Sequence, residues 1–204
     1  MNLNIPYMET DNKLLNDAYR IAAGDIVGNI VYYQNGLLTE EKPCMIAGLD
    51  YNTPWTRDTA INIWNALSIL SPEVSKNTLL AVLEEEEGNI YISGQYWDSI
   101  IWMIGAREYC RFHKDDNFYR LAFEAGRNSV HRLEEDEFDE EDGLFRGPAV
   151  YGDGIAAYPD KYSKCPNQGS GILEWVDYPG NPVYPKGYGI PMKALSTNCV
   201  YFKA

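Results

Sequence analysis

The sequence predicts an all-α chain that forms part of an (α/α) toroid, a ring of helical hairpins. Six segments carry apolar residues at helical spacing. They alternate between helices with one apolar stripe, which keep a solvent-facing side, and helices that are apolar all round, which must be buried on every side. Such alternation describes an outer and an inner layer of helices. We therefore expect three hairpins, about half of the six in a complete toroid of this type.

The first two segments show this contrast. Between Asp11 and Val31 the apolar residues lie on one side of a helix, with Asp11 as the expected N-cap. Residues 32–56 are rich in turn residues and aromatics, and we expect an irregular link with room for a short hairpin. From Asp58 to Leu70 the apolar residues cover nearly the whole circumference, which predicts an inner helix.

The later segments repeat the alternation. Ser71 is the expected N-cap of a third, outer helix that has Pro72 at its first position and ends in the acidic run EEEEG. A fourth helix, inner, is expected over 97–113, and a fifth, outer, over 116–133. A sixth, inner, helix is expected to begin near Pro191.

The length of 204 residues fits one core, so residues 1–204 are predicted to form a single unit. The sixth helical pattern runs to Ala204 with no cap or stop signal, and we expect the chain to be the N-terminal half of a larger domain. Half a toroid would expose its inner helices. It should therefore self-associate or pair with a complementary C-terminal half.

The charge balance narrows the classes of partner that the protein is expected to bind. A net charge of -13 and a pI of about 4.5 argue against binding to nucleic acid or to an anionic membrane, since phosphate binding needs a basic surface. A neutral polar partner fits better. No apolar window is long enough for a membrane span and no leader pattern opens the chain, which favours a cytoplasmic location. Removal of a signal peptide would instead leave a periplasmic or secreted protein.

No metal or cofactor is predicted. The four cysteines, Cys44, Cys110, Cys165 and Cys199, lack zinc-site spacing and are expected to be reduced thiols. The acidic runs lack the spacing of a calcium loop, and no glycine pattern matches a phosphate-binding loop.

Three polar clusters precede the three expected inner helices, at one face of the ring. They consist of acids beside aromatic rings: Trp55 with Arg57 and Asp58, Trp97 with Asp98, and Tyr151 with Asp153. The acids could instead be helix caps or surface charges. However, carboxylates that accept hydrogen bonds from hydroxyls, beside rings that stack on C–H faces, are what a sugar pocket requires.

These same stretches resemble a known family. WTRDTAINIWNALSIL, YWDSIIWMIGAREYCRFHKDDNFYRLA, and GLFRGPAVYGDGIAAYP with IPMKALSTNCVYFKA resemble, in this order, the six-hairpin glycosidases of the glycogen-debranching (amylo-α-1,6-glucosidase) and glucoamylase-like kind. The similarity spans roughly Asp50 to Ala204. The debranching enzymes carry Trp-Met-Asp where this chain has Tyr151-Gly152-Asp153.

The resemblance implies a glycoside hydrolase that inverts the cleaved centre. It implies that Arg57, Asp58 and Asp98 bind hydroxyls of the sugar at the cleaved bond, and that Asp153 donates the proton to the leaving oxygen. Inversion also needs a base carboxylate about 6.5 to 9.5 Å from the acid. The resemblance implies a base beyond Ala204, and Glu174 and Asp177 are further carboxylates in the loop after Asp153.

Two other functions remain open at this point. One is a carbohydrate-binding remnant that keeps the hydroxyl-binding cluster, lacks the base and hydrolyses nothing. The other is a helical interaction module whose loop acids are caps and surface charges.

Overall fold

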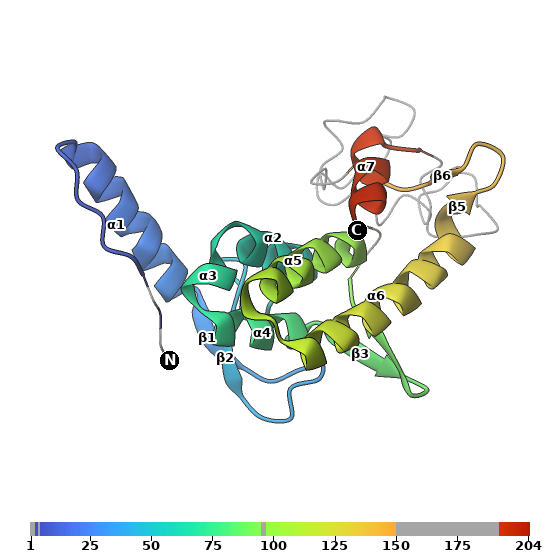
Figure 1. Cartoon of the computed structure of the whole chain (residues 1–204), viewed down its shortest axis with the longest axis horizontal. Coiled ribbons are helices and arrows are strands. Elements are labelled where there is room, and N and C mark those ends of the chain that lie inside the picture. Colours follow the sequence, from blue (N-terminus) through green and yellow to red (C-terminus); the bar gives the residue numbers. More distant parts are fainter. Residues whose placement is uncertain (1–2, 4, 95–96, 150–191) are drawn as a thin grey trace.

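The computed structural model describes residues 3, 5–94, 97–149 and 192–204 (Figure 1). A short π-helical turn, Ile63–Leu67, joins α2 to α3. The helices are α1 (Lys13–Gly28), α2 (Thr56–Asn62), α3 (Ser68–Leu70), α4 (Pro72–Ala81), α5 (Asp98–His113), α6 (Asp116–Glu137) and α7 (Leu195–Lys203). The strands are β1 (Ile30–Tyr33), β2 (Lys42–Met45), β3 (Leu83–Glu86), β4 (Asn89–Ile92), β5 (Phe138–Asp139) and β6 (Leu144–Phe145).

The prediction of an all-α toroid is wrong. The strands form three two-stranded antiparallel sheets, β1–β2, β3–β4 and β5–β6, so the fold mixes helices with small sheets. The link between the first two helices contains a hairpin in which Ile30 pairs with Met45, as the sequence allowed. The other two hairpins were not expected: β3 includes the start of the acidic run EEEEG, and β5 directly follows α6.

The hairpin β3–β4 explains one of these errors. The run EEEEG does not end α4: its first three glutamates lie in β3, in which Glu86 pairs with Asn89. The two residues between them, Glu87 and Gly88, have φ of 51° and 81°. Positive φ at both central residues defines the turn whose twist suits a two-residue hairpin. The glycine and the turn therefore override the helical propensity of glutamate.

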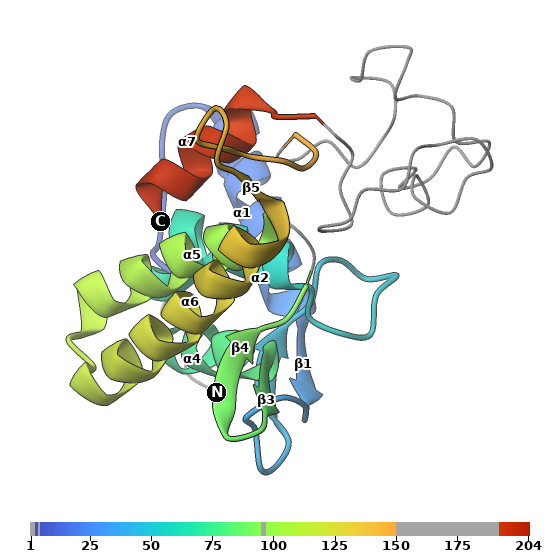
Figure 2. The same ribbon diagram turned by 90° about the vertical axis from the view of Figure 1, so that its right-hand side faces the viewer.

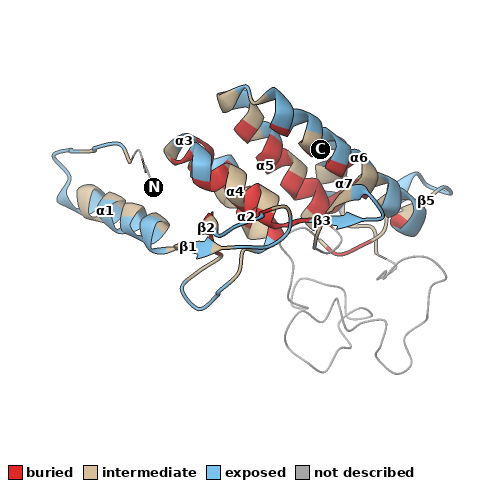
Figure 3. Cartoon of the chain, turned by 90° about the horizontal axis from the view of Figure 1, so that it is seen from below, coloured by how far each residue is buried: buried red, intermediate tan, exposed pale blue. Residues whose placement is uncertain are grey.

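The core lies around α2 and α5, which are in contact along their length (Figure 3). Ala60, Ile63 and Leu67 face it from the α2 side, and the long inner surface of α5 faces it from the other. Helices α4 and α6 pack on α5 and each keeps a solvent side. Figure 2 shows α5 beside α6, with α7 lying over them. The predicted contrast between an inner α5 and the outer helices α4 and α6 is therefore present.

The alternation fails at both ends of the chain. None of the 16 residues of α1 is buried, although its apolar stripe was expected to be covered. Thr197 is the buried residue of α7, which was expected to be an inner helix. The N-cap of α1 is Asn12 rather than Asp11, since the Asn12 side chain accepts from the amide of Leu15. A helical pattern shows which face is apolar but not which element covers it.

Helices α2 and α5 approach each other at Gly105. A Cβ atom at Gly105 would lie 2.8 Å from Ala60 Cα and 2.9 Å from its carbonyl oxygen, which is too close for any side chain. The two backbones are therefore in direct contact. This contact fixes the distance between α2 and α5 and with it the relative position of their N-termini.

We predict that Gly105→Ala lowers the free energy of unfolding by about 1 to 3 kcal/mol, because the added methyl overpacks the contact with Ala60. Gly24→Ala is the matched control, since Gly24 is also helical but has no atom within 4 Å of an added Cβ. This control should gain up to about 1 kcal/mol from helix propensity. Urea unfolding of both variants measures the difference. Equal effects would mean that the close contact does not exist in solution.

A second link ties α4 to the start of α6. Asp115 accepts from the amide of Phe118 at 3.0 Å and from Lys76 Nζ at 2.6 Å. The Lys76 ammonium, followed by the Phe118 amide, lowers the pKa of Asp115 below its ordinary value. A carboxyl with a lowered pKa stabilises the fold above its unfolded pKa, and this stabilisation is lost as pH falls through the folded value.

We predict that Asp115→Asn costs about 1 kcal/mol at pH 7, because the amide keeps the cap but loses the ion pair. Asp115→Ala should cost about 1 kcal/mol more through loss of the cap. The difference in the free energy of unfolding between the wild type and Asp115→Asn should shrink as the pH falls below about 4, because the carboxyl takes up a proton in the unfolded chain there. Urea unfolding between pH 7 and pH 3 tests this, and a difference independent of pH would contradict the assignment.

Candidate functional site

The first cluster lies at the start of α2. Trp55 is the N-cap residue, with extended backbone and no side-chain capping bond. Asp58 therefore does not cap the helix but lies in its first turn, where the helix dipole favours a negative charge. Arg57 and Asp58 are half-buried, with Arg57 Nε 4.0 Å from Asp58 Oδ2. Both side chains are held close to the end of the helix.

The second cluster lies at the start of α5. Trp97 is the N-cap residue and its ring is buried, with 6% of its surface exposed. Asp98 is the first residue of the helix and is half-buried. Gly94, at φ 110°, packs so closely that a Cβ there would lie 2.7 Å from Asp98 Cβ and Oδ2. The absence of a side chain at Gly94 leaves room for the Asp98 carboxylate.

The two helix starts meet through Arg57 and Trp97. The guanidinium carbon of Arg57 lies 4.7 Å from the centre of the Trp97 ring. A cation over an indole face is attracted by the ring quadrupole, by about 0.5 to 2 kcal/mol depending on solvation. Only 18% of the Arg57 side chain is exposed, so this contact is largely shielded from water. A second link joins Thr56 Oγ1 to Ser93 Oγ at 3.2 Å.

The third cluster is approached through Ala149. Trp97 Nε1 donates to the carbonyl oxygen of Ala149 at 3.0 Å. The next residues, 150–191, lie outside the described part of the chain, and they include Tyr151 and Asp153. The predicted positions of these two side chains are therefore neither supported nor opposed. Ala149, the last described residue before this segment, is bonded to Trp97 of the second cluster.

The described residues on either side of 150–191 are joined by hydrogen bonds. The Gly147 amide donates to the Met192 carbonyl oxygen at 2.8 Å, and Gly147 forms a parallel bridge with Lys193. The Thr197 hydroxyl in α7 donates to the Pro148 carbonyl oxygen. Lys193 Nζ contacts Asp139 Oδ2 at 2.7 Å. The described residues on the two sides of this segment therefore lie next to each other.

Sequence reasoning missed a second aromatic ring at the α2 start. Tyr51 and Trp55 form an edge-to-face pair with centroids 5.8 Å apart and planes at 73°, and both rings are about half exposed. Exposed amphipathic rings of this kind can stack on the apolar face of a sugar. The aromatic content of the link before α2 was the available signal, but its pairing could not be read from the sequence.

The described residues include no group of three or more histidine, cysteine or acidic side chains placed to hold a metal ion. Within the same part of the chain, no helix combines the length and apolar character that a membrane crossing requires. Cys44 is buried, Cys110 is half-buried and Cys199 is exposed, and all three are free thiols. Burial raises the pKa of Cys44 to about 12 and that of Cys110 to about 11. These two thiols are thus poor nucleophiles at neutral pH.

Comparisons of the chain with known protein families, with curated proteins and with solved structures find no match. The site is therefore interpreted from its own residues.

We predict that Gly94→Ala lowers the free energy of unfolding more than Gly88→Ala does. Both glycines have positive φ, which costs an alanine about 1 to 2 kcal/mol. Only Gly94 adds a collision with Asp98, since no atom lies within 4 Å of a Cβ at Gly88. Urea unfolding measures both losses. Equal losses would show that the Gly94 and Asp98 contact is looser than described.

Proposed function

We propose that the protein is a glycoside hydrolase acting on oligo- or polysaccharides, with inversion at the cleaved centre and with Asp153 as general acid. The observation that supports this most is the chain of contacts from Arg57 to the Trp97 ring and from Trp97 to Ala149. It joins the starts of α2 and α5 to a point four residues before Asp153. The family resemblance of these stretches agrees with the proposal.

The described groups suit recognition of a neutral sugar. The carboxylates of Asp58 and Asp98 accept hydrogen bonds from hydroxyls, and the Arg57 guanidinium donates them. The exposed rings of Tyr51 and Trp55 offer apolar faces beside these groups. Glycoside cleavage passes through an oxocarbenium-like transition state, which carries positive charge. Nearby carboxylates stabilise that charge more than they stabilise the neutral ground state.

In the proposed reaction, Asp153 gives its proton to the oxygen of the leaving sugar as the bond from the anomeric carbon to that oxygen breaks. Water attacks the anomeric carbon from the opposite face and loses a proton to a base carboxylate. To hold a proton near neutral pH, Asp153 needs a pKa raised by desolvation or by a nearby carboxylate. The candidate bases Glu174 and Asp177, like Asp153, lie outside the described residues.

A second candidate function is carbohydrate binding without hydrolysis. The described part of the site supports it directly, because Arg57, Asp58 and Asp98 are held by α2 and α5 and require no contribution from Asp153. The two functions share one binding site and differ in whether a bond is cleaved.

The experiment is a calorimetric titration of the full chain with gluco-, manno- and rhamno-oligosaccharides, combined with an assay for released reducing ends. Asp153→Asn should lower hydrolysis at least about a hundredfold and leave binding within about twofold, because the acid acts on the leaving oxygen. Asp98→Asn should weaken binding about tenfold through loss of a charged hydrogen bond. Asp116→Asn is the matched control: Asp116 is also in a first helical turn, at the start of α6, and binding should not change.

Three outcomes separate the candidates. Full hydrolysis by Asp153→Asn would remove this residue from the mechanism. Binding without product from the wild type would favour the second function. No binding of any sugar by the folded chain would contradict both and favour a helical interaction module.

A further inference from the structure

A large apolar groove lies on the side of α5 and α6 that faces away from α2. Its volume is about 750 Å³. On α6 its lining residues recur three and four apart from Tyr119 to Glu134, which is a continuous stripe along one helical face. The α5 lining, from Trp102 to Cys110, follows the same spacing, and α7 and β6 close one side. The groove is a seam between two helices rather than an isolated hollow.

The groove is deep because its floor is made of small residues. Ala106 on α5 and Ala122 and Gly126 on α6 line it. A Cβ at Gly126 would lie 2.7 Å from Met103 Sδ, so the glycine leaves room for the Met103 side chain between α5 and α6. Large rings stand at the rim, with 63% of Phe123 exposed. Small residues below and exposed rings above are what a helix needs in order to dock between two others.

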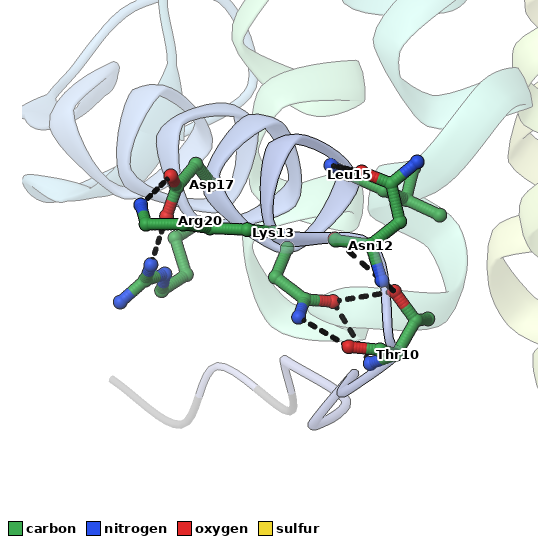
Figure 4. A network of polar contacts seen from close by, with 7 residues as sticks. Thr10, Asn12, Lys13, Leu15, Asp17 and Arg20 are labelled. Atoms are coloured by element: carbon green, nitrogen blue, oxygen red, sulfur yellow. Dashed lines mark hydrogen bonds and ion pairs between the residues drawn. The ribbon is translucent and has the colours of Figure 1, made fainter.

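Within the described part of the chain, the apolar face of α1 is exposed from Leu14 to Ala22, and Ile26 further along the helix packs against the core. Leu14, Ala18, Ile21 and Ala22 follow one another along that face, and 65% of Ile21 is exposed. The helix itself is well formed, since its start is capped by Asn12 and braced by bonds between Thr10 and Asn16 (Figure 4).

Ion pairs within α1 flank its apolar stripe, since Asp17 precedes Ile21 by four positions. Lys13 Nζ lies 2.5 Å from Asp17 Oδ2, and Arg20 pairs with the same carboxylate (Figure 4). These charges satisfy one another within the helix. The apolar face is thus the side of α1 that remains for a partner.

We propose that the groove between α5 and α6 is the docking site for α1 of a second copy of this chain. The lengths match: a 16-residue helix spans about 24 Å, and the α6 face from residue 119 to residue 134 spans about 22 Å. Within one chain, α1 lies at the opposite end of the molecule from α6 and α7 (Figures 1 and 3). Two copies related by a two-fold axis would exchange their α1 helices and bury both apolar surfaces.

Charge also points to α1 as the occupant. Asp25 lies within the apolar stripe, since it follows Ala18 by seven positions and Ile21 by four. The groove presents Arg107 and Arg127 beside a single acid, Glu134, so its charged lining is net positive in a chain whose net charge is -13. Arg107 contacts the Lys203 carbonyl oxygen, whereas Arg127 forms no ion pair within the described residues. A carboxylate in the docked stripe opposite Arg127 fixes which helix binds and in which register.

The first test is the mass of the full chain in solution, measured by light scattering and sedimentation up to about 100 µM, a range that detects micromolar association. The wild type should be a dimer. Ile21→Asp in the α1 stripe and Phe123→Asp at the groove rim should each raise the dissociation constant at least about tenfold, because each places a charge in the apolar contact. Ile69→Asp is the matched control, since Ile69 is an exposed apolar residue of α3 outside both surfaces, and it should leave the dimer intact.

A charge exchange tests the pairing itself. Asp25→Arg and Arg127→Asp should each weaken the dimer about tenfold, and an equimolar mixture of these two variants should restore it. Restoration requires that α1 of one chain meets the groove of the other, and circular dichroism confirms that each variant is folded. A monomeric wild type, a dimer unaffected by Ile21→Asp and Phe123→Asp, or a mixture that fails to recover would overturn the proposal.

Discussion

The contact between Gly105 and Ala60 determines the rest of the structure. It lets the backbones of α2 and α5 touch, so that the two most buried helices share one core. Because both helices are rigid, their N-termini are then held at a fixed distance. At these N-termini the Arg57 guanidinium carbon lies 4.7 Å from the centre of the Trp97 ring. Stability and the candidate site therefore depend on the same packing, and a change that separates the helices disturbs both.

The site extends from this pair toward the third cluster by way of the backbone. Trp97 serves twice, since its ring faces Arg57 and its indole nitrogen bonds the Ala149 carbonyl oxygen. The Gly147 and Met192 bond closes the base of the segment that follows. Polar groups at helix ends are a common location for binding residues. Hydrolysis and simple binding are both compatible with these residues, and Asp153 is what distinguishes them.

Much of the helical structure could be predicted from the sequence because its signals are local. The all-round apolar pattern gave α5 to within one residue, and Ser71 caps α4 as expected. The errors arise where the structure depends on which element packs or pairs with a segment, which the sequence pattern of that segment does not show. Glutamates 84–86 lie in a strand because the turn at Gly88 supplies a pairing strand, and no residue of α1 is buried by the described part of the chain. The sequence placed Arg57, Asp58 and Asp98 at helix starts, where the structure has them. The Arg57–Trp97 contact and the Tyr51–Trp55 pair depend on distances that only the fold supplies.

We propose that a sugar binds where the starts of α2 and α5 meet. A crystal structure of the full chain soaked with the oligosaccharide that binds it best tests this most directly. We expect a sugar ring whose hydroxyls lie within hydrogen-bond distance, about 2.5 to 3.2 Å, of the Asp58 and Asp98 carboxylates. One face of the sugar ring should lie against Trp55 or Tyr51. Ordered sugar bound elsewhere on the chain, with these carboxylates untouched, would contradict it.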